Sequence, residues 1–252
     1  MLEILILAIV QGISEFIPVS SSSHLIITSE YLNFKSSNLA LDVSLHIGSF
    51  FAVIFYFRFE ILKFLDNKIL FLKILVSSIP VMIAGFLLVK FDIVNQLRNL
   101  KVIGWTTLLF GIILYFSDRF ETSKNLSKNF SYKSAMIIGF FQVLSLIPGV
   151  SRSGITISSA RLLKFNRVDS AKISFLLSIP TLAIVSIYGL REIFLSENPE
   201  FSFTNFIAII FSFIFSYLTI KYLLLFLKKF SLNIFVVYRI ILGLIILLIS
   251  YL

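Results

Sequence analysis

The chain consists of long apolar runs separated by short polar segments. A helix that spans a bilayer needs about 20 predominantly apolar residues, and six runs approach or exceed that length. These runs are apolar on every face, whereas the strands of a transmembrane barrel would alternate apolar and polar residues. The pattern therefore predicts an all-α integral membrane protein with six transmembrane helices, at Leu39–Phe57, Ile69–Val89, Val102–Phe116, Ile173–Leu190, Phe203–Leu227 and Ile234–Leu252.

A polar stretch, Gln11–His24, interrupts the apolar N-terminal part of the chain. The run Met1–Ile17 ends at Pro18 and four consecutive serines, and a second short run, Leu25–Leu32, follows. Two short helices that meet at a polar turn predict a re-entrant hairpin. Such a hairpin is tolerated at membrane depth only where its irregular backbone is buried in protein or lines a cavity, so we expect this turn to face the interior.

The same order of features returns in the second half of the chain. The stretch Gly139–Gly154 contains an apolar run, a glutamine, an Ile-Pro pair and then clustered hydroxyls. Ser78-Ile-Pro80 and Ser178-Ile-Pro180 form a further matching pair. The sequence predicts a single membrane domain over 1–252, made of two repeats with one re-entrant hairpin and three spans each, at 1–117 and 118–252.

Loop charge indicates how the two halves lie in the membrane. The net charge is +9, and 58% of the residues are hydrophobic. In a membrane protein of this composition the basic residues mark cytoplasmic loops, so we expect no nucleic-acid partner. One side of the predicted bundle holds the basic loops Arg58–Lys68, Arg119–Lys133, Arg161–Lys172 and Lys228–Lys229, and the other holds Lys35, Lys90, Arg98, Lys101 and Arg191. Both termini are then outside, and the hairpins enter from opposite sides as an inverted-topology repeat.

The two polar turns carry the residues from which a site can be built. Gln11 and Glu15 are four residues apart and share one helix face. The serines that follow supply caps and free backbone N–H groups at a helix start, and Arg152 lies among hydroxyl residues at another. A helix N-terminus binds anions, so two of them with an arginine fork predict a doubly charged ligand such as a phosphate or diphosphate.

Other polar residues receive structural interpretations. Asp42 and His46 are four residues apart and most simply form a buried pair, with a supporting role at the site as the alternative. Lys221 and Arg239 are expected near the cytoplasmic ends of the last two spans, where long basic side chains reach the interface. The absence of cysteine excludes disulfides, and two widely separated histidines give no recognisable zinc site.

Three segments resemble the signature of a known family: Gln11-x-x-x-Glu15, Pro18-Val19-Ser20-Ser21-Ser22-Ser23-His24 and Pro148-Gly149-Val150-Ser151-Arg152-Ser153-Gly154. They are similar to segments of undecaprenyl-diphosphatase, the bacitracin-resistance family of bacterial membrane phosphatases. The similarity extends through Leu41–Gly48, both Ser-Ile-Pro elements and Tyr238-Arg239, and so covers nearly the whole chain.

The resemblance implies hydrolysis of undecaprenyl diphosphate to undecaprenyl phosphate and inorganic phosphate, which recycles the lipid carrier for peptidoglycan synthesis. It implies a multi-pass protein of the bacterial cytoplasmic membrane whose active site opens to the outer face. It also implies a divalent cation, Mg²⁺ or Ca²⁺. Bacitracin would compete for the same lipid, and a homodimer is compatible with the family.

Carried over by position, the resemblance implies a role for each candidate residue. Ser21 corresponds to the nucleophile, Glu15 to the residue that activates it or holds the metal, with Gln11 as a further ligand, and Arg152 to the clamp on the diphosphate. His24 corresponds to an essential histidine that acts as acid, base or nucleophile. Gln11 and the other hydroxyl residues would bind phosphate: Ser20, Ser22, Ser151, Ser153 and Thr156.

Two positions depart from the family pattern, and other functions stay open. Gln11 stands where many relatives have a second glutamate, and Ser23 stands where glycine is common. A polyprenyl-phosphate flippase or secondary transporter is the alternative, because inverted repeats with broken helices are common in carriers. The lipid phosphatases built on two histidines are disfavoured, because their Pro-Ser-Gly-His segment is missing from the chain.

Overall fold

The computed structural model describes residues 1–32, 34, 38–62, 68–91, 97, 99–195 and 202–252, and within these ranges it is helical with no strand. Lys35, Lys63 and Arg98, which entered the charge argument, lie outside the described residues. The helices are α1 (Leu2–Ser14), α2 (Ser21–Tyr31), α3 (Leu39–Tyr56), α4 (Arg58–Leu62), α5 (Lys68–Lys90), α7 (Leu100–Asp118), α8 (Leu126–Asn129), α9 (Tyr132–Val143), η1 (Leu144–Leu146), α10 (Arg152–Leu162), α11 (Arg167–Leu195), α12 (Phe203–Leu227) and α13 (Asn233–Tyr251).

Six of these helices are long and apolar enough to cross a membrane: α3, α5, α7, α11, α12 and α13. They match the six predicted spans, so the all-α membrane fold is confirmed. The largest difference is α11, which begins at Arg167 rather than Ile173. Asn166 explains this earlier start, because its Oδ1 accepts the Asp169 N–H at 2.8 Å and so caps the helix.

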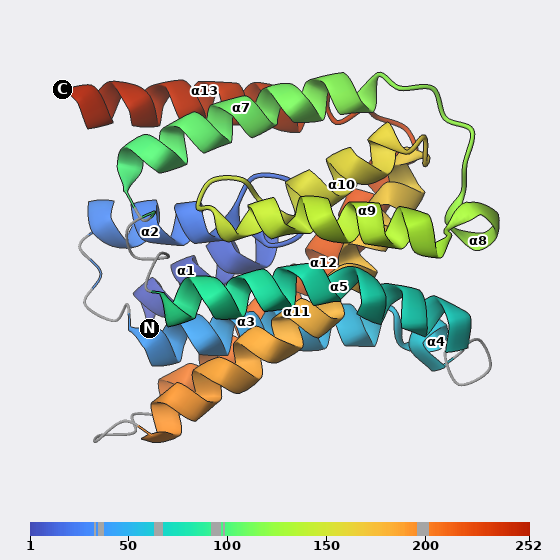
Figure 1. Ribbon diagram of the computed structural model, residues 1–252. Coiled ribbons are helices and arrows are strands. Elements are labelled where there is room, and N and C mark those ends of the chain that lie inside the picture. The colour runs from blue at the N-terminus through green and yellow to red at the C-terminus, as the bar shows by residue number, and fades with distance from the viewer. Residues whose placement is uncertain (33, 35–37, 63–67, 92–96, 98, 196–201) are drawn as a thin grey trace.

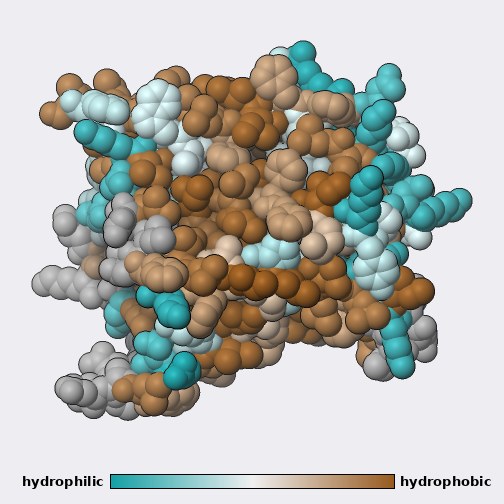
Figure 2. Space-filling model, viewed as in Figure 1, coloured by the Kyte–Doolittle hydropathy of each residue, from teal (hydrophilic) through white to brown (hydrophobic). Residues whose placement is uncertain are grey.

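Hydrophobic side chains form a broad band around the middle of the molecule, and polar side chains gather at its two ends (Figure 2). The long helices run between these ends, and both chain termini lie at the left-hand end in Figure 1. The short helices α4 and α8 lie at the opposite end. This arrangement is the one expected of a bundle whose axis follows the membrane normal.

Glycines allow two pairs of helices to approach closely. A Cβ on Gly12 of α1 would lie 2.5 Å from the Phe215 Cβ of α12, and one on Gly139 of α9 would collide with the Ser77 carbonyl oxygen of α5. Small residues permit such packing in membranes, where tight van der Waals contact replaces the hydrophobic drive. The first helix of each predicted hairpin is thus packed against a long helix of the other predicted repeat.

Two helical hairpins meet in the middle of the bundle. In Figure 1 the α1–α2 hairpin and the α9–α10 hairpin point in opposite directions, and their turns overlap at the centre. The residues before α2 and α10 have positive φ, 82° at Ser20 and 71° at Ser151. A non-glycine residue with positive φ is strained and tends to mark a functional site. The re-entrant placement in a membrane and the inverted repeat stay predictions.

The Ser-Ile-Pro pair does not mark equivalent places in the two halves. Pro80 lies in α5, the second long helix after the first hairpin, whereas Pro180 lies in α11, the first long helix after the second. The stronger correspondence is between α2 and α10, which both have 11 residues and both follow a serine with positive φ.

Candidate active site

Glu15 lies at the centre of a polar cluster between the two hairpin turns. It follows α1 as the C-cap residue and is buried. Its Oε1 accepts a hydrogen bond from Arg152 Nη2 at 2.9 Å, and its Oε2 accepts from Ser21 Oγ at 2.7 Å. Gln11 Nε2 also donates to Oε2, at 3.1 Å. The carboxylate therefore joins the predicted nucleophile to the predicted phosphate clamp.

Arg152 brings the second hairpin to this cluster. It is the first residue of α10, and its Nη1 donates to the Ser174 carbonyl oxygen of α11 at 3.2 Å. Beside it, Ser153 Oγ donates to the Ile17 carbonyl oxygen of the first turn at 2.8 Å. An ion pair and a hydrogen bond thus join the two turns. A guanidinium has five donors in a planar fork, so Arg152 keeps N–H groups for a further anion.

The charge state of Glu15 follows from its neighbours. Burial alone would raise the pKa of the carboxyl, but the Arg152 guanidinium and His46, with the hydrogen bonds from Ser21 and Arg152, hold the pKa of Glu15 below its ordinary value. Glu15 is therefore ionised at neutral pH, as a group that accepts a proton or binds a cation must be.

The serines of the first turn lie around the start of α2. Ser20 Oγ is 3.0 Å from Ser23 Oγ and 3.4 Å from Ser22 Oγ, and Ser22 is exposed while Ser20 and Ser23 are buried. Ser21 is partly exposed and is the member of this group that contacts Glu15. Of the four serines, Ser21 thus combines access with an acceptor for its proton.

The hydroxyls of the second turn have structural partners in this structure. Ser151 Oγ accepts the Gly154 N–H at 3.1 Å and lies 3.2 Å from Ser153 Oγ, so Ser151 caps α10. Thr156 Oγ1 lies 2.7 Å from Ser174 Oγ, and Thr156 is fully buried. Thr156 therefore supports the α10–α11 packing directly behind Arg152.

Both ring nitrogens of His24 have a partner. Nδ1 lies 2.6 Å from the Ser20 carbonyl oxygen, and Nε2 lies 2.6 Å from the Tyr238 hydroxyl of α13. His24 comes one helical turn after Ser20 in α2, on the helix that also begins with Ser21. Sequence reasoning included Tyr238 in the resemblance but gave it no role.

His46 and a group of buried serines lie behind Gln11. His46 Nδ1 is 3.0 Å from Gln11 Nε2 and 3.9 Å from Glu15 Oε2, which agrees with the supporting role that the sequence left open. Ser49 Oγ lies 3.5 Å from Gln11 Nε2 and forms hydrogen bonds with Ser212 and Ser216 of α12. These contacts orient the Gln11 amide so that its nitrogen faces Glu15.

Arg239 of α13 corrects the prediction that it would reach the membrane interface. It is fully buried, and its Nη1 donates to the Pro18 carbonyl oxygen at 3.1 Å and to the Val150 carbonyl oxygen at 3.0 Å. Its Nη2 donates to the Gly149 carbonyl oxygen at 2.9 Å. The prediction was wrong because the position of Arg239 in the helix does not show that backbone carbonyl oxygens lie within reach of its side chain. The overlooked signal was a lone arginine inside an apolar span, which is costly unless its donors are satisfied.

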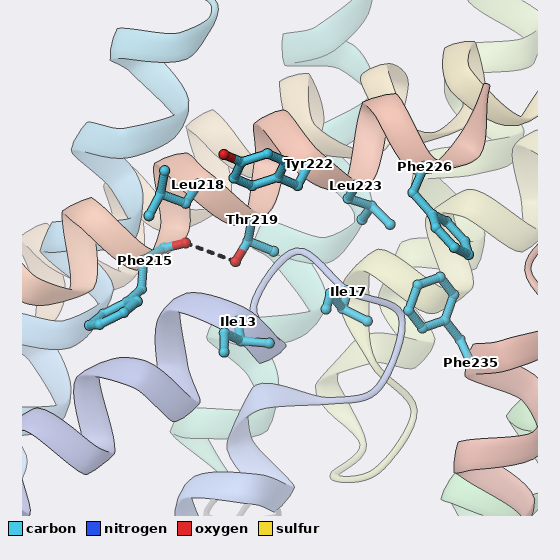
Figure 3. A pocket seen from close by; sticks show the side chains of 9 residues that line it. All are labelled: Ile13, Ile17, Phe215, Leu218, Thr219, Tyr222, Leu223, Phe226 and Phe235. Carbon is cyan, nitrogen blue, oxygen red and sulfur yellow. Dashed lines mark hydrogen bonds between the residues drawn. The ribbon is translucent and has the colours of Figure 1, made fainter. Parts of the chain in front are cut away.

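An apolar groove runs beside the first hairpin turn (Figure 3). It has a volume of about 410 Å³ and lies between α12, the start of α13 and the hairpin residues Ile13 and Ile17. Thr219 also lines the groove, and its hydroxyl donates to the Phe215 carbonyl oxygen at 2.8 Å. The groove therefore suits a hydrocarbon. Two of its lining residues, Ile13 and Ile17, are each two positions from Glu15 in the sequence. Its other lining residues are Leu218, Tyr222, Leu223, Phe226 and Phe235.

The oxygens available to a metal ion are few. Among the described residues, no cluster of three or more histidine, cysteine, aspartate or glutamate side chains can hold one. Gln11 Oε1, however, is buried without a hydrogen-bond partner in the described part of the chain, and it belongs to the amide that contacts Glu15. A hard cation takes oxygen ligands, and Mg²⁺ is often held by one or two side chains together with substrate phosphates. Glu15 and Gln11 fit that incomplete kind of site.

The chain is similar to known proteins over nearly its whole length. The family model described as "Bacitracin resistance protein BacA" matches residues 4–245. The chain is 50% identical to the undecaprenyl-diphosphatase of Pelagibacter ubique (strain HTCC1062), over 99% of this chain and 98% of the relative. It is 36% identical to that of Jannaschia sp. (strain CCS1), over 98% and 97%, and 40% identical to that of Hahella chejuensis (strain KCTC 2396), over 96% and 95%.

Proposed function

Because the chain belongs to the bacitracin resistance protein BacA family, we propose that it is a membrane phosphatase that hydrolyses undecaprenyl diphosphate to undecaprenyl phosphate and inorganic phosphate. The observation that carries this proposal is the contact of Ser21 and Arg152 with the two oxygens of Glu15. The reaction would return the lipid carrier to cell-wall synthesis. It would also remove the lipid for which bacitracin competes.

Ser21 is the proposed nucleophile and Glu15 the group that takes its proton. The Ser21 Oγ–P bond forms at the terminal phosphorus while the bond from that phosphorus to the bridging oxygen breaks. The hydroxyl proton passes over the 2.7 Å contact to Glu15, and undecaprenyl phosphate leaves. Water then hydrolyses the phosphoserine to inorganic phosphate. A serine hydroxyl needs such a base because it is a weak nucleophile at its own pKa.

Arg152 couples substrate binding to this activation. Its remaining N–H groups suit the oxygens of a diphosphate, which a planar fork binds in a bidentate manner. When the guanidinium turns from Glu15 to the diphosphate, the carboxylate loses the strongest of the neighbours that lower its pKa. Glu15 is then a stronger base in the substrate complex than in the free enzyme.

The starts of α2 and α10 support the binding of the phosphate groups. Both helices begin at the overlapping turns, so their dipoles favour an anion there. Ser22 is the exposed hydroxyl of the first turn, and with Ser20 it is a proposed donor to phosphate. Ser151, Ser153 and Thr156 hold the second turn and Arg152 in place.

Glu15 and Gln11 are the residues that would hold a divalent cation, Mg²⁺ or Ca²⁺, beside the diphosphate. The unpaired, buried Gln11 Oε1 is the observation that favours this choice. When bound, the cation would help to neutralise the charge that develops on the phosphate groups. The Gln11 amide keeps its nitrogen on Glu15 through the contacts with His46 and Ser49.

The apolar groove is the proposed place for the first isoprene units of the substrate. Its volume falls within the range of about 300–1,000 Å³ typical of ligand pockets. Ile13 and Ile17 connect it to the turn that carries Glu15, and Figure 3 shows it extending along α12 toward Phe226 and Phe235. With the diphosphate at the turn and the first isoprene units in this groove, the polar part of the lipid would meet polar groups and its apolar part would meet apolar side chains.

The proposed orientation has both termini and the opening of the active site on the outer face. In Figure 1 the basic helix α8 lies at the end away from the termini, which suits a cytoplasmic position for that end. The α1–α2 hairpin would then enter from outside, and the diphosphate would reach the turn from that face while the hydrocarbon extends toward the other leaflet.

Phosphate release from undecaprenyl diphosphate by the purified protein in detergent with Mg²⁺ tests the proposal. The wild type should turn over, and Ser21→Ala and Arg152→Ala should lose activity about 100-fold or more, the scale of one catalytic group. Ser127→Ala and Arg119→Ala are matched controls, because both residues are exposed and lie away from the turns. Normal turnover in Ser21→Ala would remove Ser21 as nucleophile.

The same protein in liposomes distinguishes the flippase alternative. The phosphatase proposal expects no movement of a labelled polyprenyl phosphate between leaflets beyond that of protein-free liposomes. Movement that persists in Ser21→Ala, without phosphate release by the wild type, would instead support a carrier built on the same opposed hairpins.

A further inference from the structure

Tyr238 of α13 is bonded to His24 of α2. Its hydroxyl oxygen lies 2.6 Å from His24 Nε2, and the two rings are nearly parallel, with an interplanar angle of 17° and centroids 5.7 Å apart. Tyr238 therefore holds the imidazole both by a hydrogen bond and by its ring face. Residues 214 positions apart in the sequence meet in this contact.

The partners of the imidazole define where its proton lies. His24 Nδ1 is 2.6 Å from the Ser20 carbonyl oxygen, which can only accept, so Nδ1 carries the proton. In the neutral imidazole Nε2 then has the free lone pair and accepts from the Tyr238 O–H. Burial lowers the pKa of His24, the bond to Ser20 opposes this, and the charge of Arg239 lowers it further, so the neutral form is favoured.

Arg239 fixes the position of this tyrosine. It is the next residue in α13, and its guanidinium bonds the Pro18 and Val150 carbonyl oxygens of the two turns. These bonds anchor α13 at the level of the turns, and Tyr238 is placed over α2 as a result. The Tyr238-Arg239 pair thus joins one helix to the turns and to His24.

We propose that Tyr238 is a catalytic residue of the phosphatase, whose hydroxyl carries a proton from the water that hydrolyses the phosphoserine to the unprotonated Nε2 of His24. The proposal rests on the proposed function. The water gives its proton to the Tyr238 hydroxyl oxygen as its own oxygen bonds the phosphorus, and the Tyr238 hydroxyl proton passes over the 2.6 Å contact to Nε2, from which a proton is later lost to solvent. The bond from phosphorus to Ser21 Oγ breaks, and Glu15 returns its proton to that oxygen.

Tyr238→Phe tests the role by removing the hydroxyl while keeping the ring. We expect kcat to fall about tenfold, the scale of one lost hydrogen bond, with KM within about twofold of wild type. Tyr251→Phe is the matched control, because Tyr251 is an exposed tyrosine in the last turn of the same helix, and both constants should stay within about twofold. An unchanged kcat, or a change confined to KM, would overturn the proposal.

A spectroscopic measurement on the same variants reads the contact without turnover. In protein with ¹⁵N-labelled histidine, the His24 signals, assigned by their loss in His24→Gln, should show the Nδ1–H tautomer, and Tyr238→Phe should shift Nε2. An unshifted Nε2 signal overturns the proposed role of the Tyr238 hydroxyl whether or not phosphate is released. If Tyr238→Phe shifts the Nε2 signal but the wild type releases no phosphate, the proposed function is refuted while the Tyr238–His24 contact is confirmed.

Discussion

Glu15 Oε1 lies 2.9 Å from Arg152 Nη2, although the two residues are 137 positions apart in the sequence. The carboxylate comes from the end of α1 and the guanidinium from the start of α10, so the two hairpins share one ion pair. Both side chains are largely buried, and a buried charge without its partner is costly. The pair therefore contributes to the meeting of the turns as well as to their proposed chemistry.

Glu15→Gln should abolish phosphate release and destabilise the protein by about 3–5 kcal/mol, because Arg152 would be left as an uncompensated buried charge. Since the pKa of Glu15 in the folded protein lies below its ordinary value, the stability from the ionised carboxylate is present at neutral pH and is lost as pH falls through the lowered pKa.

Phosphate release measures the first effect, and thermal unfolding of wild type and Glu15→Gln between pH 7 and pH 3 measures the change in stability and its pH dependence. The gap in melting temperature should narrow as the pH falls, because wild type loses a stabilising charge that the variant never had. A gap that widens toward acid pH would contradict the assigned charge state. Glu121→Gln is the control, because Glu121 is exposed, and it should melt as wild type does.

Arg239→Lys should be inactive and less stable by about 3 kcal/mol or more, although the charge is kept. A lysine ammonium has three donors and no planar fork, so it cannot satisfy the carbonyl oxygens of Pro18, Gly149 and Val150 together. Melting temperature and phosphate release measure the two effects. Arg119→Lys at the exposed end of α7 should change neither, and normal activity of Arg239→Lys would show that the fork is dispensable.

Gly139→Ala should destabilise the protein by about 1–3 kcal/mol, because the added methyl would collide with the Ser77 backbone of α5, which cannot rotate away. Gly85→Ala is the matched control. The nearest atom to its added methyl is the flexible Leu146 Cδ2 at 3.7 Å, and alanine favours the helix by about 1 kcal/mol relative to glycine. Equal melting temperatures for the two variants would argue against close α9–α5 packing.

Thr219→Trp should fill the apolar groove and raise KM for undecaprenyl diphosphate about tenfold or more, with kcat little changed, because loss of uniform binding appears in KM. A short-chain prenyl diphosphate that makes little use of the groove should show a much smaller effect. Leu248→Trp on the exposed face of α13 is the control. Equal effects on both substrates would place the hydrocarbon elsewhere while leaving the phosphatase intact.

Single cysteines test the orientation, since the native chain has none. Asn125→Cys, beside α8, and Ser202→Cys, before α12, should react with an impermeant maleimide from opposite sides of the membrane, Ser202→Cys from outside. Labelling of both positions from one side would refute the inverted repeat.

The helical content of the fold was predictable from the sequence, because apolar runs of spanning length have few alternatives in a bilayer. Glu15 and Ser21 could be placed together because only one turn separates them. Their contact with Arg152 could be expected from the matching hairpins, but the distance could not, since it depends on how α1 packs against α12 and α9 against α5. Those contacts depend on how the surfaces of two helices fit together, and the pattern of apolar residues along one sequence does not show this fit.

Arg239 and Tyr238 show the other limit of sequence reasoning. An arginine in the first half of an apolar helix can reach the interface or turn inward, and the local sequence is the same in both cases. The acceptors that decide the matter are carbonyl oxygens of Pro18, Gly149 and Val150, which any residue would provide. Every residue has a backbone carbonyl oxygen, so the sequence does not show which of them Arg239 binds. The structure is needed to show that Arg239 joins the two turns.

One nitrogen, Arg239 Nη1, bonds a carbonyl oxygen from each hairpin, and it belongs to a helix that leaves the ribosome after both hairpins. The two turns can be synthesised and inserted early, but the guanidinium that joins them arrives only when α13 enters the membrane. The proposed catalytic centre is therefore completed only after α13 has been inserted. A chain that ends before α13 would contain Glu15, Ser21 and Arg152. It would still lack the Arg239 guanidinium that joins the two turns.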